Sequence, residues 1–285
     1  RRLVSGLVTL APLGSLTLKG RAETVAAYRV VSLERPAGAS ATAFVGRDDE
    51  LRRLAAVYDA AVAAPAGRLV VILGSPGLGK SRLVEEFARR LGDGAPALTA
   101  HCDAAGGATF APIARALRTH LRIDDGSGSD VVRAAIAAAL PADDAERSRI
   151  AGGIAALLAG TPGSPEETFF VVRRLLAALA TARPVVLAID DLHWAQPLLL
   201  DLIEHLVQWG AGMPLLVLAA ARPELRDARS SLASSGGLVA EVVTLAGLDA
   251  GAATRLAASV IGADELPAAV AGRVLTTSEG NPLFV

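Results

Sequence analysis

The stretch Gly74-Ser75-Pro76-Gly77-Leu78-Gly79-Lys80-Ser81 determines the fold expected for this chain of 285 residues. It matches the pattern GxxxxGK(S/T), follows the apolar run 69–73, and precedes Leu83, Val84 and Phe87 at helical spacing. A polyphosphate must be wrapped closely by backbone N–H groups, which glycine-rich backbone at a helix N-terminus presents without a Cβ in the way. A chance glycine-rich turn is the alternative, but the strand before the motif and the helix after it favour a phosphate-binding loop, or P-loop.

The side chains at the end of this motif supply the charge and the metal ligand that a nucleoside triphosphate needs. Lys80 is expected to place a positive charge on the β- and γ-phosphates, and the Ser81 hydroxyl is the expected ligand of Mg²⁺. The backbone from Gly74 to Ser81, with Arg82 directly behind it, would contact the nucleotide. The motif therefore predicts that the chain binds ATP with Mg²⁺.

A second element places two carboxylates at the end of a strand. The apolar run 185–189 is followed by Asp190 and Asp191, and α/β sheets place their ligand chemistry at the carboxyl ends of strands. Asp190 is expected to hold the Mg²⁺ shell through water, as the Walker-B aspartate does. Asp191 could polarise the attacking water as a general base. The alternative for the pair is helix capping before Pro197.

From residue 44 onward, apolar strand-like runs alternate with helical stretches, which is typical of a parallel sheet covered on both faces. The expected strands are 69–73, 97–102, 185–190, 215–220 and 241–245. The expected helices are 48–64, 80–91, 112–121, 169–180, 197–209, 249–260 (with Asp249 as its N-cap) and 266–277; 126–129 and 161–165 are expected loops around small alanine-rich helices. The sequence predicts an α/β P-loop NTPase with a parallel five-stranded sheet flanked by helices, followed by the start of a helical lid.

Four stretches carry a resemblance to a known family. They are Phe44-Val45-Gly46-Arg47-Asp48-Asp49-Glu50-Leu51, Asp190-Asp191-Leu192-His193-Trp194-Ala195, Ala221-Arg222-Pro223-Glu224 and Gly280-Asn281-Pro282-Leu283. In this order they are similar to the AAA-type ATPase domain of the signal-transduction ATPases with numerous domains, the STAND group, in the branch related to origin-recognition ATPases and found in large bacterial regulators. The resemblance covers about residues 44–285 and implies a nucleotide-driven conformational switch with slow ATP hydrolysis.

The resemblance also implies roles for residues outside the P-loop. Arg222 would register the γ-phosphate from the end of the fourth strand, with an ordinary solvated arginine as the alternative. Pro282 would pack on the adenine side and couple the lid helices to the nucleotide, although a helix stop would explain the same composition. Val45 and Gly46 would line the base from the other side.

The segment after the acidic pair is less specific. The resemblance implies that His193 and Trp194 transmit the nucleotide state, and a core tryptophan with a helix-capping histidine explains them equally well. Where the family often has an acid, this chain has Gln196, which argues against a role for charge at that turn.

The first residues resemble a different family. Leu16-Thr17-Leu18-Lys19-Gly20, followed by Val25, Ala27, Tyr28, Arg29 and Val30, looks like the final strands of a class III adenylate/guanylate cyclase catalytic domain. Short strand-like runs at 7–10, 16–18 and 27–31 are separated by Gly14 and Gly20 as turn signals, and any β-hairpin end would give the same pattern. The expected organisation is a cyclase-like remnant at 1–36 without cyclase activity, a linker at 37–43, the ATPase core at 44–247 and a truncated lid at 248–285.

Composition limits the partners and the location that we expect. The formal net charge of −1 does not favour a nucleic-acid partner. Every long apolar stretch is interrupted before the roughly 18–20 residues that a membrane helix requires, so we expect a cytoplasmic protein. The single Cys102 is expected to be a small buried residue at a strand end.

The expected partners are ATP or ADP, neighbouring domains of the same polypeptide and, depending on nucleotide, a second copy of the chain. Two alternative functions stay open. One is the regulatory region of an adenylate cyclase whose catalytic domain lies upstream, and the other is an origin-recognition-like, DNA-associated ATPase.

Overall fold

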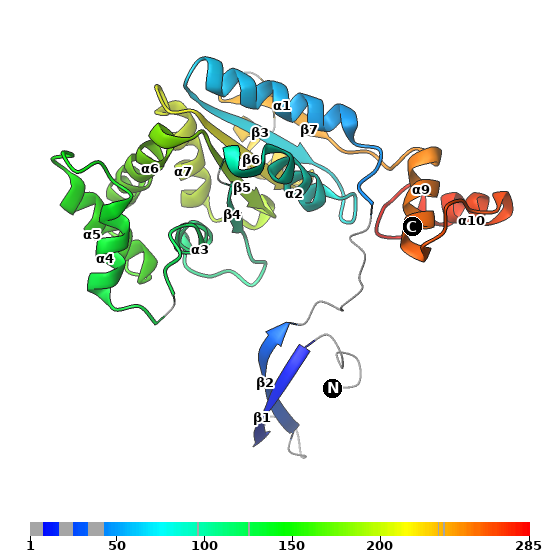
Figure 1. Ribbon diagram of the computed structural model, residues 1–285, viewed down its shortest axis with the longest axis horizontal. Helices are drawn as coiled ribbons and strands as arrows, with labels where there is room; N and C mark the ends of the chain where they lie inside the picture. Colours follow the sequence, from blue (N-terminus) through cyan, green and yellow to red (C-terminus); the bar gives the residue numbers. More distant parts are fainter. Residues whose placement is uncertain are drawn as a thin grey trace.

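The computed structural model of the protein describes residues 8–16, 25–33, 43–95, 97–124, 126–232, 234–235 and 237–285. Residues 17–20, which carry part of the cyclase resemblance and the Gly20 turn signal, lie outside the described residues, as does the expected linker up to residue 42. Figure 1 shows the helical segment α4–α5 at one end of the sheet and the helices α9 and α10 at the other.

A parallel five-stranded sheet forms the centre of the molecule, as the sequence predicts. Its strands are β3 (Gly67–Leu73), β4 (Ala97–His101), β5 (Val185–Asp190), β6 (Leu215–Ala221) and β7 (Val239–Thr244). Their order across the sheet is β4-β5-β6-β3-β7, and every neighbouring pair is parallel. Because β3, β5 and β6 each have a strand on both sides and helices on both faces, their continuous apolar runs are buried throughout.

Helices cover both faces of the sheet, with α1 and α2 on one face and α3, α6 and α7 on the other. The helices of the described residues are α1 (Asp48–Ala63), α2 (Lys80–Leu91), α3 (Ala111–His120), α4 (Ser129–Ala138), α5 (Arg147–Leu158), α6 (Pro165–Ala182), α7 (Pro197–Gln208), α8 (Leu225–Ala228), α9 (Ala250–Ile261) and α10 (Ala268–Ser278), with short 3-10 turns η2 (Gly92–Gly94), η3 (Leu192–Trp194) and η4 (Ser230–Leu232). Within the described ranges, none of these helices has both the length and the apolar character needed to cross a membrane.

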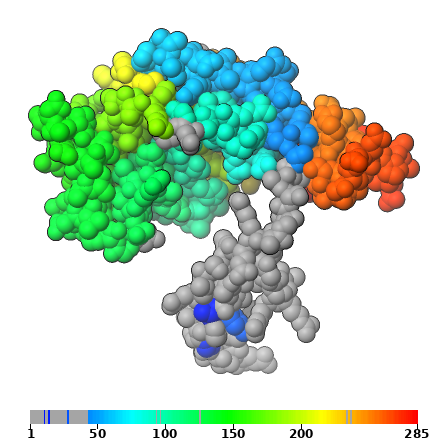
Figure 2. Space-filling model, viewed as in Figure 1, coloured from blue at the N-terminus to red at the C-terminus, as the bar shows by residue number. Residues whose placement is uncertain are grey.

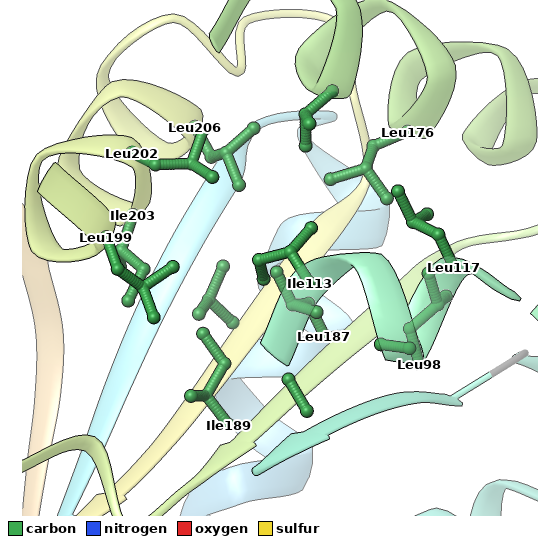
Figure 3. Close-up of a cluster of buried hydrophobic side chains, with 14 of the residues drawn as sticks. Leu98, Ile113, Leu117, Leu176, Leu187, Ile189, Leu199, Leu202, Ile203 and Leu206 are labelled. Carbon is green, nitrogen blue, oxygen red and sulfur yellow. The ribbon is translucent and has the colours of Figure 1, made fainter. Parts of the chain in front are cut away.

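Alternate residues of each central strand pack into two separate cores. On β3, Val71 and Leu73 face the core shared with α3, α6 and α7, whereas Val70 and Ile72 face the core shared with α1 and α2. This alternation follows from the two-residue repeat of a strand. Figure 3 shows the larger core, in which Leu187 and Ile189 of the sheet lie among leucine and isoleucine side chains of the covering helices.

Helix α6 is longer than the sequence pattern predicts. The expected start near residue 169 is wrong, because α6 begins at Pro165 and the loop before it ends at Ser164. The Ser164 side chain accepts a hydrogen bond from the Glu167 backbone N–H at 3.3 Å, and proline suits the first helical position. The sequence Ser-Pro-Glu-Glu is typical of a helix start. The apolar periodicity begins only near residue 169, so periodicity alone predicts a later start.

The first described residues form two antiparallel strands, β1 (Val8–Leu16) and β2 (Val25–Leu33). The expectation that Gly14 is a turn is wrong, because Gly14 lies inside β1 with a φ of 94° at a register shift between Pro12 and Gly14. A β-bulge accommodates such a residue without ending the strand.

The helices α9 and α10 lie beside the first described residues of the α/β core, near Gly46. Asp249 is the N-cap of α9, as predicted, and its side chain accepts a hydrogen bond from Ala252 N–H at 2.8 Å. A Cβ on Gly46 would lie only 2.5 Å from the Ala252 Cβ, so glycine permits this close approach. Figure 2 shows the orange and red atoms of α9 and α10 next to the blue atoms at the start of the core.

We predict that Ile203→Ala lowers the free energy of unfolding by about 2–5 kcal/mol, because it leaves a cavity between α7 and the sheet. Ile203 is fully buried, whereas Ile261 at the end of α9 is 67% exposed. The matched substitution Ile261→Ala should therefore cost less than about 1 kcal/mol. Urea titration followed by circular dichroism measures both, and equal losses would contradict the assignment of the core.

Candidate functional site

The P-loop connects β3 to α2 at the carboxyl edge of the sheet. β3 ends at Leu73, and α2 begins at Lys80. Gly77 and Gly79 have φ angles of 84° and 87°, a left-handed conformation that side chains rarely adopt. Gly79 occupies the N-cap position and has no side chain to bond the first N–H groups of α2, so those groups can receive an anion.

Lys80 is buried at the base of this loop. Its Nζ donates hydrogen bonds to the carbonyl oxygens of Gly74 at 2.8 Å and Ser75 at 3.2 Å, so the side chain folds back over its own loop. Burial lowers the pKa of the ammonium group, while the carboxylates of Asp191 and Asp190 act in the opposite direction. Lys80 therefore lies close to both acids at the end of β5.

Ser81 and Asp190 are in direct contact across the sheet edge. The Ser81 hydroxyl donates a hydrogen bond to Asp190 Oδ2 at 2.6 Å. A hydroxyl and a carboxylate oxygen are ligands that Mg²⁺ accepts, and this ion commonly takes its remaining ligands from phosphates and water. The described residues contain no cluster of three or more His, Cys, Asp or Glu suited to a metal. This donor pair thus fits an ion that arrives with a phosphorylated ligand, and it does not fit an ion held by protein alone.

Asp191 has an unusual backbone conformation. Its φ and ψ are 54° and 38°, in the left-handed region, and its N–H donates to Asp190 Oδ1 at 2.9 Å. The side chain makes no capping hydrogen bond to the turn η3 that follows, within the part of the chain that the structure describes. Its oxygens lie 3.9 Å from His101 Nε2 and 3.9 Å from His193 Nδ1. The carboxylate thus lies between two imidazoles, and helix capping does not account for it.

Arg222 directly follows β6 and is half-buried. Its guanidinium carbon lies 5.7 Å from the ring centre of Trp194, within the range of a cation–π contact. The positive charge of Arg222 also contributes to lowering the Lys80 pKa, so the two cations share one environment. The structure therefore brings Arg222 to the same edge of the sheet as the P-loop and the acidic pair.

The turn η3 differs from both simple explanations given for its residues. Trp194 is 43% exposed, so it is not a core tryptophan. The His193 side chain is 7% exposed, and neither of its ring nitrogens has a hydrogen-bond partner among the described residues, so it caps no helix.

A hollow of about 230 Å³ lies beside the P-loop, between the start of the core and the lid helices. Its lining includes Val45, Leu78, Gly79, Arg82 and Pro282 from the predicted set, together with Phe44, Leu248 and Leu256. Gly46 does not line it and instead packs against α9. The lining is largely apolar, which suits the flat face of a base.

Two polar residues that the sequence did not single out join the P-loop to the lid. Asn281 Nδ2 donates to the Pro76 carbonyl at 3.1 Å, and a Cβ on Gly77 would lie 2.6 Å from Asn281 Oδ1. Arg47 is buried, and its Nη2 donates to the carbonyls of Leu78 at 3.2 Å and Ala246 at 2.7 Å. Both residues stood within motifs, but only the fold reveals which carbonyls they reach.

Gln196 also has a structural role that the sequence did not predict. Its Nε2 donates to the Gly107 carbonyl at 2.8 Å, and its Oε1 accepts from the Thr109 hydroxyl at 2.5 Å. A carboxylate could not donate to Gly107, so the amide is required for both bonds. It ties the loop after β4 to the turn after β5. Cys102 begins that loop and is buried, as predicted, and burial raises its thiol pKa to about 11.

Comparison with known proteins places this geometry in context. A curated relative, an uncharacterized protein of Rhizobium meliloti (strain 1021), is 28% identical over 229 residues, which are 74% of this chain and 22% of the relative. The chain thus spans about a fifth of the length of this relative.

Solved structures share the fold. The Cdc6p protein of Pyrobaculum aerophilum matches with a TM-score of 0.50 and 13% identity, covering 81% of this chain and 53% of that one. A STAND protein with a tetratricopeptide repeat sensor from Pyrococcus horikoshii matches with a TM-score of 0.48 and 18% identity, covering 84% of this chain and 28% of that one. The likeness to the Cdc6p protein, at 13% identity, supports the fold alone.

The family model of the AAA ATPase domain matches residues 43–218. This range contains the P-loop, the acidic pair, the whole of β3, β4 and β5, and the first part of β6. Because the match covers more than half of the chain, the protein belongs to the AAA ATPase domain family.

Proposed function

We propose that this chain is a regulatory ATPase module in which bound ATP and its slow hydrolysis change the position of the lid helices. The observation that carries the proposal is that the P-loop contacts both the sheet and the lid segment. Its loop backbone lies at the end of β3, while Pro76 and Gly77 meet Asn281 of the lid segment. A ligand that moves the P-loop therefore acts on the lid directly.

The hollow beside the P-loop supports ATP as the ligand. With phosphates at the start of α2, the base would lie against Val45 and Pro282, which both line that hollow. A nucleotide in this position contacts the core and the lid together. It binds more tightly to whichever lid position completes the hollow, and this difference in affinity is what shifts a conformational equilibrium.

The acidic pair and the two cations support slow hydrolysis. Ser81 and Asp190 would hold Mg²⁺, which neutralises phosphate charge when bound. Lys80 would exchange its loop carbonyls for phosphate oxygens, and Arg222 would register the γ-phosphate. Asp191 would accept the proton of the attacking water, whose oxygen bonds to the γ-phosphorus as the bond to the ADP oxygen breaks.

The whole protein of which this module is part belongs to the proposal as well. The four stretches similar to STAND proteins support a multidomain bacterial signalling protein, in which the output is movement of neighbouring domains. The antiparallel pair β1–β2 supports a cyclase-type domain upstream, because the cyclase resemblance falls on this hairpin and the residues between its strands. The net charge of −1 does not favour the DNA-associated alternative.

We predict that Lys80→Ala weakens ATP binding by about 10- to 100-fold, since a charge-assisted hydrogen bond contributes roughly 1.5–3 kcal/mol. Equilibrium titration with a fluorescent ATP analogue measures the affinity. Arg133→Ala on α4 is a suitable control, because Arg133 is exposed and lies outside the site. Unchanged affinity and unchanged turnover in Lys80→Ala would refute the assignment of the P-loop.

Asp191→Asn should lower ATP turnover by about 100- to 10,000-fold while leaving the affinity for ATP within about threefold, because a general base acts in the chemical step. Asp190→Asn should instead weaken Mg²⁺-dependent ATP binding, since Asp190 would be lost as a metal ligand. Phosphate release and nucleotide titration distinguish the two variants. Persistent hydrolysis in Asp191→Asn would show that Asp191 is not the base.

Deleting residues 280–285 should weaken the binding of ADP and ATP by about tenfold, which corresponds to about 1.4 kcal/mol. The deletion removes Pro282 from the hollow and Asn281 from the P-loop. Phe284→Ala is the matched control, because that side chain is 67% exposed and outside the lining. Identical affinities for the deletion and the full chain would count against the lid contact.

A further inference from the structure

The imidazole of His193 is buried in the turn η3 without a hydrogen bond. Its side chain is 7% exposed, and Nδ1 and Nε2 both lack a partner among the described residues. Buried polar atoms are nearly always hydrogen-bonded, because leaving them unpaired costs free energy. The nearest acid is Asp191, whose Oδ1 lies 3.9 Å from His193 Nδ1.

His193 is suited to donate one hydrogen bond. Burial lowers the pKa of the His193 imidazole, Asp191 and Glu224 act in the opposite direction, and Arg222 and Lys80 lower the pKa further, which favours the neutral ring. A neutral imidazole carries one N–H donor and one acceptor nitrogen. With the proton on Nδ1, the donor faces the carboxylate of Asp191.

The ring plane of His193 is fixed from the other side. The ring lies 4.9 Å from the Trp194 ring, centre to centre, with a tilt of 41°. The guanidinium of Arg222 lies over the same tryptophan at 5.7 Å. Trp194 therefore connects the orientation of His193 to the end of β6, and the imidazole has little freedom to turn away from Asp191.

We infer that His193 is a positioning residue for Asp191. In the ATP-bound state, the His193 Nδ1–H donates a hydrogen bond to Asp191 Oδ1 and holds the carboxylate toward the attacking water. The inference rests on the proposed ATPase function. A movement of roughly 1 Å would bring the two atoms to the usual hydrogen-bond distance. Asp191 has a left-handed backbone conformation, and its Oδ1 already lies 3.9 Å from His193 Nδ1.

His101 also approaches Asp191, but it does not provide the same constraint. Its side chain is 54% exposed, and its nitrogens lie 3.9–4.0 Å from Asp103, Asp190 and Asp191. A solvated ring that is shared among three carboxylates does not select one orientation of Asp191. The ring of His193 is buried and close to one acid, so it can select one orientation of Asp191.

The test compares two substitutions at position 193 by single-turnover ATP hydrolysis on the full chain. His193→Phe keeps the ring against Trp194 without a donor, and His193→Asn supplies an N–H near the place of Nδ1. We expect His193→Phe to slow the chemical step about 10- to 100-fold with nucleotide affinity within about twofold. His193→Asn should recover most of this loss.

Two further variants separate positioning from packing. His205→Phe is the matched control, because His205 on α7 also has a buried unpartnered Nε2 but stacks on Phe169, 5.4 Å away, outside the site. It should leave the rate unchanged. In an Asp191→Asn background, His193→Phe should add little further loss, because residues that act as a unit are not additive.

A spectroscopic measurement tests the hydrogen bond without turnover. The chain has four histidines, so ¹⁵N-histidine labelling gives few signals, and His193→Asn identifies the one of interest. With Mg²⁺ and a non-hydrolysable ATP analogue, the His193 Nδ1–H proton should move downfield and exchange more slowly with water. Asp191→Ala should abolish both changes.

The inference is overturned if folded His193→Phe keeps the wild-type rate, if His193→Asn is as slow as His193→Phe, or if the proton signal does not respond to saturating analogue. Failure of the proposed function looks different. The wild-type chain would then fail to bind ATP or fail to hydrolyse it, and Asp191→Asn would change neither the affinity for ATP nor its turnover. A wild-type chain that depends on Asp191 but not on His193 refutes the positioning role alone.

Discussion

The hydrogen bond between Ser81 and Asp190 is the contact on which the rest of the site depends. It joins the first turn of α2 to the end of β5 at 2.6 Å, across 109 positions of sequence. The sheet order makes this possible, because β6 alone separates β3 from β5 and all three strands end at the same edge. Lys80, Asp191 and Arg222 reach the P-loop for the same reason. The site is therefore a property of strand order, and the helices on both faces hold that order in place.

The lid depends on close contacts with this same edge. Gly46 allows α9 to approach the start of the core, and Gly77 allows Asn281 to lie against the P-loop. Arg47 adds a buried guanidinium that bonds the carbonyl of Leu78 and that of Ala246, just before the lid. A small change in the loop backbone must therefore alter contacts of both the core and the lid, because tightly packed segments cannot move independently.

Local patterns were enough to predict the sheet and the P-loop. Apolar strand-like runs predicted all five strands, and the Gly-Lys-Ser motif predicted the start of α2, because both signals lie within a few neighbouring residues. The contacts of Asn281, Gln196 and His193 could not be predicted, since each depends on a backbone group or carboxylate whose position is set by the fold. The start of α6 does not follow from apolar periodicity, because its first turn is polar. The N-cap Ser164 is the local signal that marks this start.

The resting contacts of Lys80 bear on how strongly a nucleotide can shift the lid. Its Nζ already donates to two loop carbonyls, so a phosphate must replace these bonds. The net gain in binding free energy is the difference between the new bonds from Lys80 to phosphate and the lost bonds from Lys80 to the loop carbonyls. Hydrogen bonds between charged partners are worth about 1.5–3 kcal/mol each. Such a difference changes the affinity for the nucleotide by about one to two orders of magnitude, since each 1.4 kcal/mol is tenfold. It shifts the lid only by the part that differs between the two lid positions. Under the proposed function, a net gain of this size suits reversible binding of the nucleotide better than it suits irreversible capture.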